Sequence, residues 1–308
     1  MYDLVIIGGG PAGVAAGVYA ARKQIKTALF AESFGGQSVE SNEIQNWIGT
    51  TTISGIELAN NLKEHVKFYA NGFVDIKEGE KIEEITRSSN GFEVITQKGS
   101  YKTKTILIAS GSRRRKLDIP GAKEFEGRGI TYCASCDGPF FKDKDVVVIG
   151  GGNAGFETAA ELLAYCKSVT LLEVGEFHAD PVTIKKVLEN PKMKALTNAM
   201  PTEVKGDESV KSLTYKKTAP FVDIVEIEVE GIFVEIGHVP ATDFAKDIGV
   251  EMDEYECIKI DYKNQRTNIE GIWAAGDCTN IPYHQNNIAA GDAVKALEDI
   301  YQTLQKMK

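Results

Sequence analysis

A glycine-rich motif that occurs twice in the 308-residue chain constrains its fold more than any other feature. A short apolar run, residues 3–7, leads into the glycine-rich segment 8–13, and the same arrangement returns at a constant offset of 142 residues, in 145–149 and 150–155. An alanine-rich, helix-like stretch follows each copy. A continuous apolar run is typical of a parallel strand that is buried on both faces. The repeat therefore predicts an α/β protein with two strand–loop–helix units.

Each copy has the spacing G-x-G-x-x-G, in which each glycine has its own role. The first allows a tight turn, the second lets the backbone approach a pyrophosphate, and the third lets the helix pack against the strand. The N-terminus of the helix adds N–H groups and the positive end of its dipole. One such motif is a weak signal, but two in this context predict two dinucleotide-binding domains of the three-layer, Rossmann-like kind. The candidate binding residues are Gly8, Gly10, Pro11, Ala12 and Gly13 in the first copy and Gly150, Gly152, Asn153, Ala154 and Gly155 in the second.

An acidic residue follows each loop near the distance at which such units bind a ribose. Glu32 lies 19 residues after Gly13, and Glu173 lies 18 residues after Gly155, each behind an apolar run. A carboxylate in this place accepts hydrogen bonds from ribose hydroxyls. The alternative is a surface residue at the end of a strand, and the paired units favour binding.

A C-x-x-C pair, Cys133 and Cys136, precedes the second copy, and Asp137 follows it directly. The pair suits a redox dithiol or half of a zinc site. A structural zinc site takes four ligands, and the remaining cysteines form no second pair. These are Cys166, Cys257 and Cys278, for which we expect core positions. We therefore expect a redox dithiol with a neighbouring proton donor, and no metal. A dithiol with two dinucleotide units indicates FAD and NAD(P)H, because flavin accepts hydride from a nicotinamide and passes electrons to a disulfide.

Charge and hydropathy limit the class of protein further. The net charge of −9 argues against binding to nucleic acid through its phosphates. No run of about 20 apolar residues is present to cross a bilayer. The acidic start of the chain is unlike a signal peptide, so we expect a cytoplasmic protein that does not bind membranes. The four histidines are His65, His178, His238 and His284, and they show no metal-ligand spacing. We expect structural roles for them, and only His284 is expected to lie near a site.

The order of the motifs predicts that the first domain is discontinuous. Residues 271–277 form another apolar run, which ends in Gly276 and Asp277, and a stretch with apolar residues at helical spacing follows over about 285–304. The alternative for Asp277 is a turn or helix-cap residue. We expect a FAD domain formed by residues 1–112 and 243–308, and an NAD(P)H domain with the dithiol over 113–242.

These motifs resemble those of the low-molecular-weight thioredoxin reductases along essentially the whole chain, and most of all the reductase part of the flavoprotein subunit of alkyl hydroperoxide reductase. The likeness to the thioredoxin reductases rests on residues 8–13, 35–37, 109–111, 133–138, 150–155 and 276–277. The likeness to that flavoprotein subunit rests on residues 133–141, 169–173, 202–207, 231–234 and 274–278. It implies a homodimeric FAD enzyme that passes electrons from NAD(P)H through the dithiol to a disulfide on a thioredoxin- or glutaredoxin-like protein.

The resemblance also implies roles for single residues. Cys136 would lie nearest the flavin, Cys133 would attack the partner disulfide, and Asp137 would handle protons. Thiol–disulfide exchange requires a thiolate, and an adjacent acid can supply a proton to the leaving sulfur. The flavin-binding residues that it implies are Gly36, Gln37, Asn46, Gly111, Gly276, Asp277, Gln285, Asn286 and Ile288. As an alternative, Gln37 and Asn46 are ordinary turn residues.

One departure from the resemblance concerns the nicotinamide cofactor. Members that use NADPH carry a basic His-Arg-Arg pattern after the second strand of the nicotinamide unit, but here residues 173–178 contain no arginine. Glu173 would repel a 2′-phosphate and accept a 2′-hydroxyl, which favours NADH, although Lys185 and Lys186 are within possible reach of a phosphate. Two other functions stay open. One is an NADH oxidase or peroxiredoxin-system reductase that works through a separate thioredoxin-fold carrier, and the other is a non-catalytic flavin or nucleotide sensor.

Overall fold

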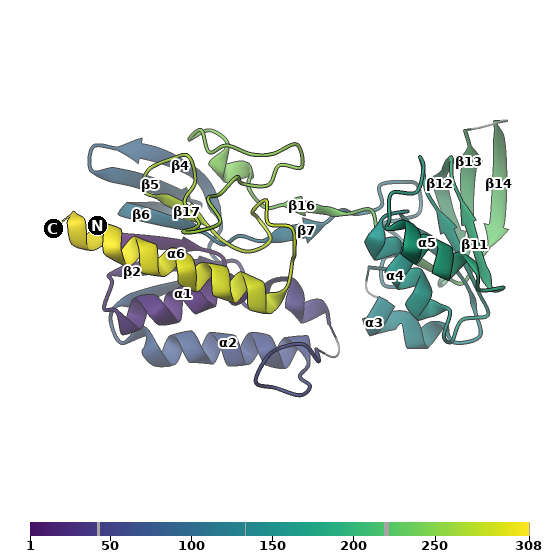
Figure 1. The fold of residues 1–308 in the computed structure, drawn as a ribbon, viewed down its shortest axis with the longest axis horizontal. Coiled ribbons are helices and arrows are strands. Elements are labelled where there is room, and N and C mark those ends of the chain that lie inside the picture. Colours follow the sequence, from purple (N-terminus) through teal and green to yellow (C-terminus); the bar gives the residue numbers. More distant parts are fainter. Residues whose placement is uncertain (42–43, 133, 219–221, 308) are drawn as a thin grey trace. The chain divides into compact units, whose positions relative to one another are not determined.

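The computed structural model describes residues 1–41, 44–132, 134–218 and 222–307 of the chain (Figure 1). These residues divide into two compact units. The first combines Met1–Arg113 with Val239–Lys308, and the second is Arg114–His238. The chain passes between the units twice, in β7 (Ser112–Arg114) and β16 (His238–Pro240), and these two short strands pair with each other.

A seven-stranded sheet forms the centre of the first unit. Its strands are β1 (Tyr2–Ile7), β2 (Thr27–Ala31), β3 (Val74–Glu78), β4 (Ile82–Ser88), β5 (Gly91–Thr96), β6 (Gly99–Ile108) and β17 (Ile272–Ala274). The order across the sheet is β3-β2-β1-β6-β5-β4, and β17 pairs with β6 in addition. The pairs among β3, β2, β1, β6 and β17 are parallel, whereas the pairs β4–β5 and β5–β6 are antiparallel.

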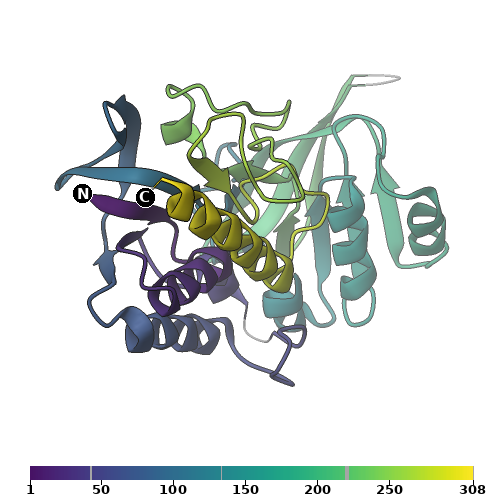
Figure 2. The same ribbon diagram turned by 60° about the vertical axis from the view of Figure 1, so that its left-hand side comes forward.

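Helices cover one face of this sheet, and they are α1 (Pro11–Arg22), α2 (Gly55–Ala70) and α6 (Asn286–Lys306). Helix α1 packs against both α2 and α6, as the turned view in Figure 2 also shows. The apolar run of β1 is buried on both faces: Leu4 and Ile6 contribute to the core under the helices, and Val5 and Ile7 contribute to the core on the opposite face. The continuous apolar pattern is therefore that of a central strand with two covered faces.

The second unit has a five-stranded sheet in the order β11-β10-β9-β15-β8 and a three-stranded sheet in the order β12-β13-β14. The parallel strands of the larger sheet are β8 (Ile130–Thr131), β9 (Asp145–Ile149), β10 (Ser168–Leu172), β11 (Met193–Leu196) and β15 (Gly231–Val234). The antiparallel strands are β12 (Ala199–Gly206), β13 (Val210–Lys217) and β14 (Asp223–Glu228). As in β1, alternate residues of β9 contribute to separate cores on the two faces of the sheet.

The helices of this unit are α3 (Ala134–Asp137), α4 (Asn153–Leu162) and α5 (Pro181–Leu188). Short 3₁₀ helices lie in both units, at η1 (Gly36–Glu40), η2 (Gly138–Phe141) and η3 (Asp243–Ala245). The predicted α/β class is confirmed, because β1 and β9 each lead through a glycine loop into α1 and α4. Among the described residues, the helices are all too short or too polar to span a membrane.

Candidate functional site

The first glycine of each loop adopts a backbone conformation that other residues rarely adopt. Gly8 has φ of 130° and Gly150 has φ of 122°. A Cβ atom at Gly8 would lie 2.0 Å from the carbonyl oxygen of Ala109, and one at Gly150 would lie 2.2 Å from that of Glu235. The chain turns sharply at these points against the end of the neighbouring parallel strand, so only glycine fits.

The third glycine of each loop lets helix and loop approach closely. A Cβ atom at Gly13 would lie 1.9 Å from the oxygen of Gly8, and one at Gly155 would lie 1.9 Å from the oxygen of Gly150. The two loops therefore fold in the same way, as the repeat predicts. In both loops, the third glycine has no side chain, so the first turn of the helix can pack directly against the turn that follows the strand.

The second glycine of each loop caps the following helix. The space beside Gly10 forms an open cradle for an anion, whereas the side chain of His178 lies beside Gly152. Gly10 is the N-cap of α1 and Gly152 is the N-cap of α4, and neither cap has a side-chain hydrogen bond to the helix. A Cβ atom at Gly10 would meet nothing closer than the Cα atom of Gly36, at 3.8 Å. Backbone N–H groups without a capping side chain, next to space that a methyl group would enter, suit the pyrophosphate of a dinucleotide.

The two acidic residues predicted to bind ribose have different surroundings. The carboxylate of Glu173 accepts hydrogen bonds from the backbone N–H groups of Gly151, at 2.6 Å, and Gly175, at 3.0 Å, so it lies against the glycine loop. The carboxylate of Glu32 is exposed and lies 3.5 Å from the guanidinium of Arg113. Of the two, only Glu173 is held in place by its own glycine loop.

Predicted flavin-binding residues from both ends of the chain meet in the first unit. The side-chain amide of Asn46 donates to Oε1 of Gln285 at 2.9 Å, and the hydroxyl of Ser38 donates to Oδ1 of Asn286 at 3.0 Å. The amide of Gln37 donates to the hydroxyl of Ser112 at 2.8 Å. The first two bonds join the segment after β2 to the N-terminus of α6, and the third joins the same segment to the start of β7.

The remaining predicted residues of the first unit include Gly111, which lies between β6 and β7, and Gly276 and Asp277, which follow β17. Gly276 has φ of 77°, and its Cβ atom would lie 3.4 Å from the side chain of Ala12 in the first loop. Asp277 lies 3.6 Å from Nδ1 of His284, the histidine that the sequence places near a site. The carbonyl of Gly111 accepts a hydrogen bond from Ala241 at 3.0 Å, and Ile288 packs against the core.

The dithiol segment is only partly described. Cys133 lies outside the described residues, and Cys136 is described only as part of the α3 backbone. Asp137, at the end of α3, accepts a short hydrogen bond from the hydroxyl of Thr131 on β8. The sequence places the acid beside the dithiol, but it gives no signal for Thr131 as its partner.

The other three cysteines are poor nucleophiles. Cys166 and Cys278 are fully buried, as predicted, whereas Cys257 is partly exposed. Burial raises the pKa of each of the three thiols to about 11. Because the thiolate is the reactive form, they contribute little to thiol chemistry near neutral pH.

Another titratable group, Glu235, directly follows β15 and lies beside Gly150 of the second glycine loop. Its carboxylate accepts a hydrogen bond from the hydroxyl of Thr158 at 2.9 Å. Burial raises the pKa of this carboxyl, and the bond from Thr158 and the charge of Arg114 oppose that shift. Sequence reasoning missed this residue, since a lone glutamate after a strand carries no distinctive signal.

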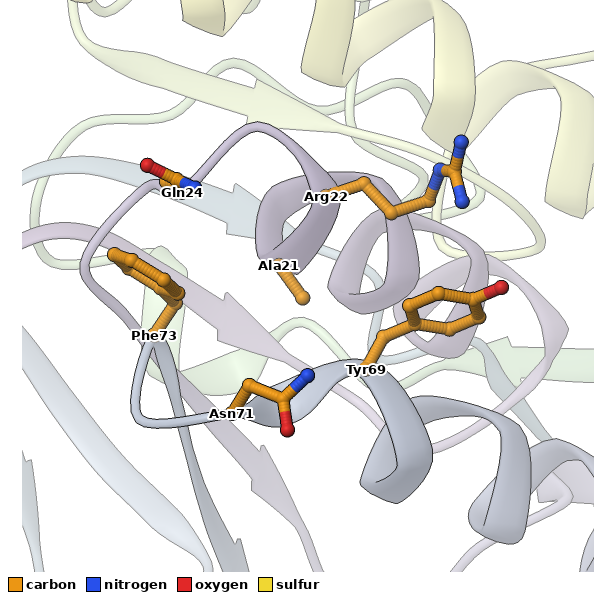
Figure 3. A pocket seen from close by; sticks show the side chains of 6 residues that line it. All are labelled: Ala21, Arg22, Gln24, Tyr69, Asn71 and Phe73. Carbon is orange, nitrogen blue, oxygen red and sulfur yellow. The ribbon is translucent and has the colours of Figure 1, made fainter.

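Within the described ranges, no cluster of three or more histidine, cysteine, aspartate or glutamate side chains has the geometry of a metal site. A surface pocket of the first unit lies elsewhere, at the C-terminal end of α1 (Figure 3). Its lining residues are Ala21, Arg22, Gln24, Tyr69, Asn71 and Phe73. The glycine loop lies at the other end of the same helix, about 18 Å away at 1.5 Å per residue, so this pocket is separate from the candidate site.

Two dinucleotide cradles and a C-x-x-C segment with an adjacent acid define a nucleotide-dependent oxidoreductase. Residues 2–293 match the model of the pyridine nucleotide-disulphide oxidoreductase family, and the chain belongs to this family. Membership implies the use of FAD and NAD(P)H, and the glycine loops of both units fit such cofactors.

Curated relatives include the F subunits of bacterial alkyl hydroperoxide reductases. The protein from Pseudomonas putida is 42% identical over 96% of this chain, and that from Escherichia coli K12 is 40% identical over 100% of it. A protein named NADH dehydrogenase, from Bacillus subtilis, is 38% identical over 96% of the chain. The chain spans 56%, 59% and 57% of the lengths of these three relatives.

Solved structures of thioredoxin reductases resemble the chain over its full length. The thioredoxin reductase of Lactococcus lactis has a TM-score of 0.80 and 35% identity, covering 99% of this chain and 100% of that one. The enzyme from T. acidophilum has a TM-score of 0.77 and 34% identity, covering 98% of each chain. The resemblance stated from the sequence motifs is confirmed.

Proposed function

We propose that this protein is a flavin-dependent disulfide reductase that transfers electrons from NADH to the disulfide of a small thioredoxin- or glutaredoxin-like protein. The observation that carries the proposal is the placement of Cys133, Cys136 and Asp137 directly before the second of two glycine loops with the same geometry. Neither a zinc site nor a simple nucleotide sensor requires that combination.

We assign FAD to the first unit and the nicotinamide nucleotide to the second. The first loop, with Gly10 and the N-terminus of α1, would hold the pyrophosphate of FAD. Gln37, Asn46 and Asp277 would hold the ring and ribityl chain. Asn46 bonds to Gln285 at the start of α6, and Gln37 bonds to Ser112 at the start of β7. FAD, when bound, accepts two electrons from the nicotinamide and supplies them to a disulfide.

The dithiol would complete the reaction by two exchange steps. The thiolate of Cys133 attacks the partner disulfide, which forms a mixed disulfide and releases one partner thiolate that takes up a proton. The thiolate of Cys136 then attacks Cys133, which closes the Cys133–Cys136 disulfide and releases the second partner thiol. Two electrons and two protons pass to the partner. Asp137 would supply the proton to a leaving sulfur, and its bond to Thr131 would keep it oriented.

We propose NADH as the preferred nucleotide. The Glu173 carboxylate is held at the second loop by the N–H groups of Gly151 and Gly175, where it would accept a ribose 2′-hydroxyl. The same carboxylate would repel a 2′-phosphate. Two lysines near the end of α5, Lys185 and Lys186, are the groups through which NADPH would be accommodated instead.

Two related functions are supported by the names of the relatives. The alkyl hydroperoxide reductase relatives favour a role as a peroxiredoxin-system reductase that acts through a separate carrier, and the NADH dehydrogenase of B. subtilis favours an NADH oxidase. The reductase and the oxidase differ in whether the dithiol is needed. We also propose a homodimer, on the resemblance to thioredoxin reductases alone.

The test is to screen purified thioredoxin-fold proteins from the same source for reduction that depends on NADH and on the FAD-loaded protein. We expect wild type to bleach NADH when the correct partner is present. Cys133→Ser and Cys136→Ser should abolish this turnover but retain FAD and NADH-dependent reduction of a small dye. Cys257→Ser is the matched control and should behave as wild type. Full turnover by either dithiol variant would refute the proposal in favour of an oxidase.

A further inference from the structure

One histidine that the sequence marked only as structural lies against the second glycine loop. A Cβ atom at Gly152 would lie 2.9 Å from Nε2 of His178 and 3.4 Å from its Cδ2 atom. The side chain of His178 is exposed. An exposed imidazole beside the second glycine of the motif lies where the backbone of such a loop approaches a pyrophosphate.

The backbone around His178 is fixed from both sides. The N–H group of His178 donates to the carbonyl of Gly151 at 3.0 Å, which ties the residue to the loop itself. Phe177 packs edge to face on the buried ring of Phe156 at 5.3 Å, and Ala179 is buried. The segment is thus preorganised, and the imidazole is its part that remains open to a ligand.

Hydrogen bonds at the start of α4 and α5 hold the same segment. The side-chain carbonyl of Asn153, the first residue of α4, accepts from the N–H group of Asp180 at 2.8 Å. Asp180 in turn caps α5 through the N–H group of Val182 at 2.8 Å. Asn153, which the sequence marked as a cofactor-binding residue, therefore also positions the chain that carries His178.

The first unit shows what occupies the equivalent place in the other loop. The atom nearest to a Cβ at Gly10 is the Cα of Gly36, at 3.8 Å. Gly36 and His178 are separated by 142 positions, the same offset as the glycine motifs. The two units thus present different groups to the same point: backbone with no side chain in the first, and an imidazole in the second.

We propose that His178 binds the pyrophosphate of the dinucleotide on the second loop by donating a hydrogen bond from its ring to a phosphate oxygen. This inference rests on the proposed function, in which the second unit binds NADH. An imidazole has at least one N–H donor, and hydrogen bonds to charged phosphate oxygens are among the stronger ones. Glu173 and Glu176, the acids of the same segment, offer a phosphate no donor. Glu173 instead bonds to loop N–H groups, and Glu176 lies 3.4 Å from the amide of Asn198.

The experiment measures binding to the FAD-loaded protein by titration calorimetry, with ADP-ribose as the probe that carries the pyrophosphate. Adenosine, measured as a competitor of ADP-ribose, is the probe that lacks it. We expect His178→Ala to weaken ADP-ribose about tenfold or more, equal to ~1.4 kcal/mol, and to leave adenosine unchanged. His178→Gln, which keeps an N–H donor, should recover part of the loss. His65→Ala, a histidine of α2 in the other unit, is the control and should match wild type.

The outcomes separate this inference from the proposed function. Failure of wild type to bind ADP-ribose would refute the nucleotide site and the inference together. Binding by wild type with unchanged affinity in His178→Ala would refute only the role of His178. Tighter binding by His178→Ala would also refute it, since the ring would then obstruct the loop. An equal loss for adenosine and ADP-ribose would show a general disturbance of the site instead of a phosphate contact.

Discussion

Substitution of Gly10 by alanine separates the two roles of the first glycine loop, folding and ligand binding. At Gly10, φ is −78°, which alanine adopts freely, and the new methyl group would lie 3.8 Å from its nearest neighbour, an ordinary contact. At Gly13, the methyl group would lie 1.9 Å from a backbone oxygen. Gly10→Ala therefore leaves the fold of the apoprotein intact, whereas Gly13→Ala forces helix α1 away from the glycine loop.

The magnitudes follow from these distances. Gly13→Ala should lower the free energy of unfolding by ~3 kcal/mol, the upper part of the range for overpacking, because backbone cannot move aside as a side chain can. Gly10→Ala should cost less than about 1 kcal/mol, since alanine is only a poorer N-cap than glycine. In the bound state, however, its methyl group enters the cradle for the pyrophosphate. Loss of one hydrogen bond to a charged oxygen, about 1.5–3 kcal/mol, corresponds to roughly 10- to 150-fold weaker binding of FAD.

The assay has two parts: urea unfolding of the apoprotein, followed by circular dichroism, and titration with FAD, followed by quenching of flavin fluorescence. Gly291→Ala, in α6 of the same unit, is the control, because its Cβ atom would meet nothing within 4 Å. That control should bind FAD as wild type does and be equally or slightly more stable. The reasoning is refuted if Gly10→Ala binds FAD normally, or if it destabilises the apoprotein as much as Gly13→Ala.

Three further predictions concern the chemistry of the site. Asp137→Asn should lower disulfide turnover by ~10²–10⁴-fold, the usual scale for acid–base help, with unchanged FAD content; steady-state kinetics over a range of pH checks this, and an unaltered rate would reduce Asp137 to a turn residue. Wild type should prefer NADH to NADPH by at least about tenfold in kcat/KM, because NADPH would lose a hydrogen bond to the charged Glu173 and meet repulsion instead, a difference of ~1–3 kcal/mol. Replacement of Glu173-Val174-Gly175 by His-Arg-Arg should shift the preference toward NADPH. Comparable efficiency of wild type with both nucleotides would contradict the predicted preference. Because burial raises the pKa of Cys166, Cys257 and Cys278 to about 11, these thiols stay protonated and slow to react until the pH approaches that value. Mass spectrometry of the reduced native protein after brief alkylation at pH 8 should therefore find label on Cys133 and Cys136 alone, and rapid labelling of a third cysteine would show that its burial is not persistent.

Local sequence determined the parts of the fold that depend on neighbouring residues. The apolar runs of β1 and β9 predicted buried parallel strands, and the glycine spacing predicted the turn and the close approach of helix to loop seen at Gly13 and Gly155. Each of these features needs only a few consecutive residues, since strand burial and turn conformation are encoded at short range. The dithiol and its neighbouring acid were visible for the same reason.

The tertiary structure alone decided which distant residues meet. Ser38 and Asn286 are 248 positions apart and bond only because the chain returns to the first unit and starts α6 beside the first loop. His178 gave no signal as a single histidine until it lay beside the second glycine of its loop. The resemblance had marked Gly36 as a flavin-binding residue, but not as the counterpart of His178. Propensity and spacing act along the chain, whereas these contacts depend on the order of strands in a sheet and on how the segments after them fold back. The sequence therefore predicted the cradles, and the packing of later segments determined which side chains face them.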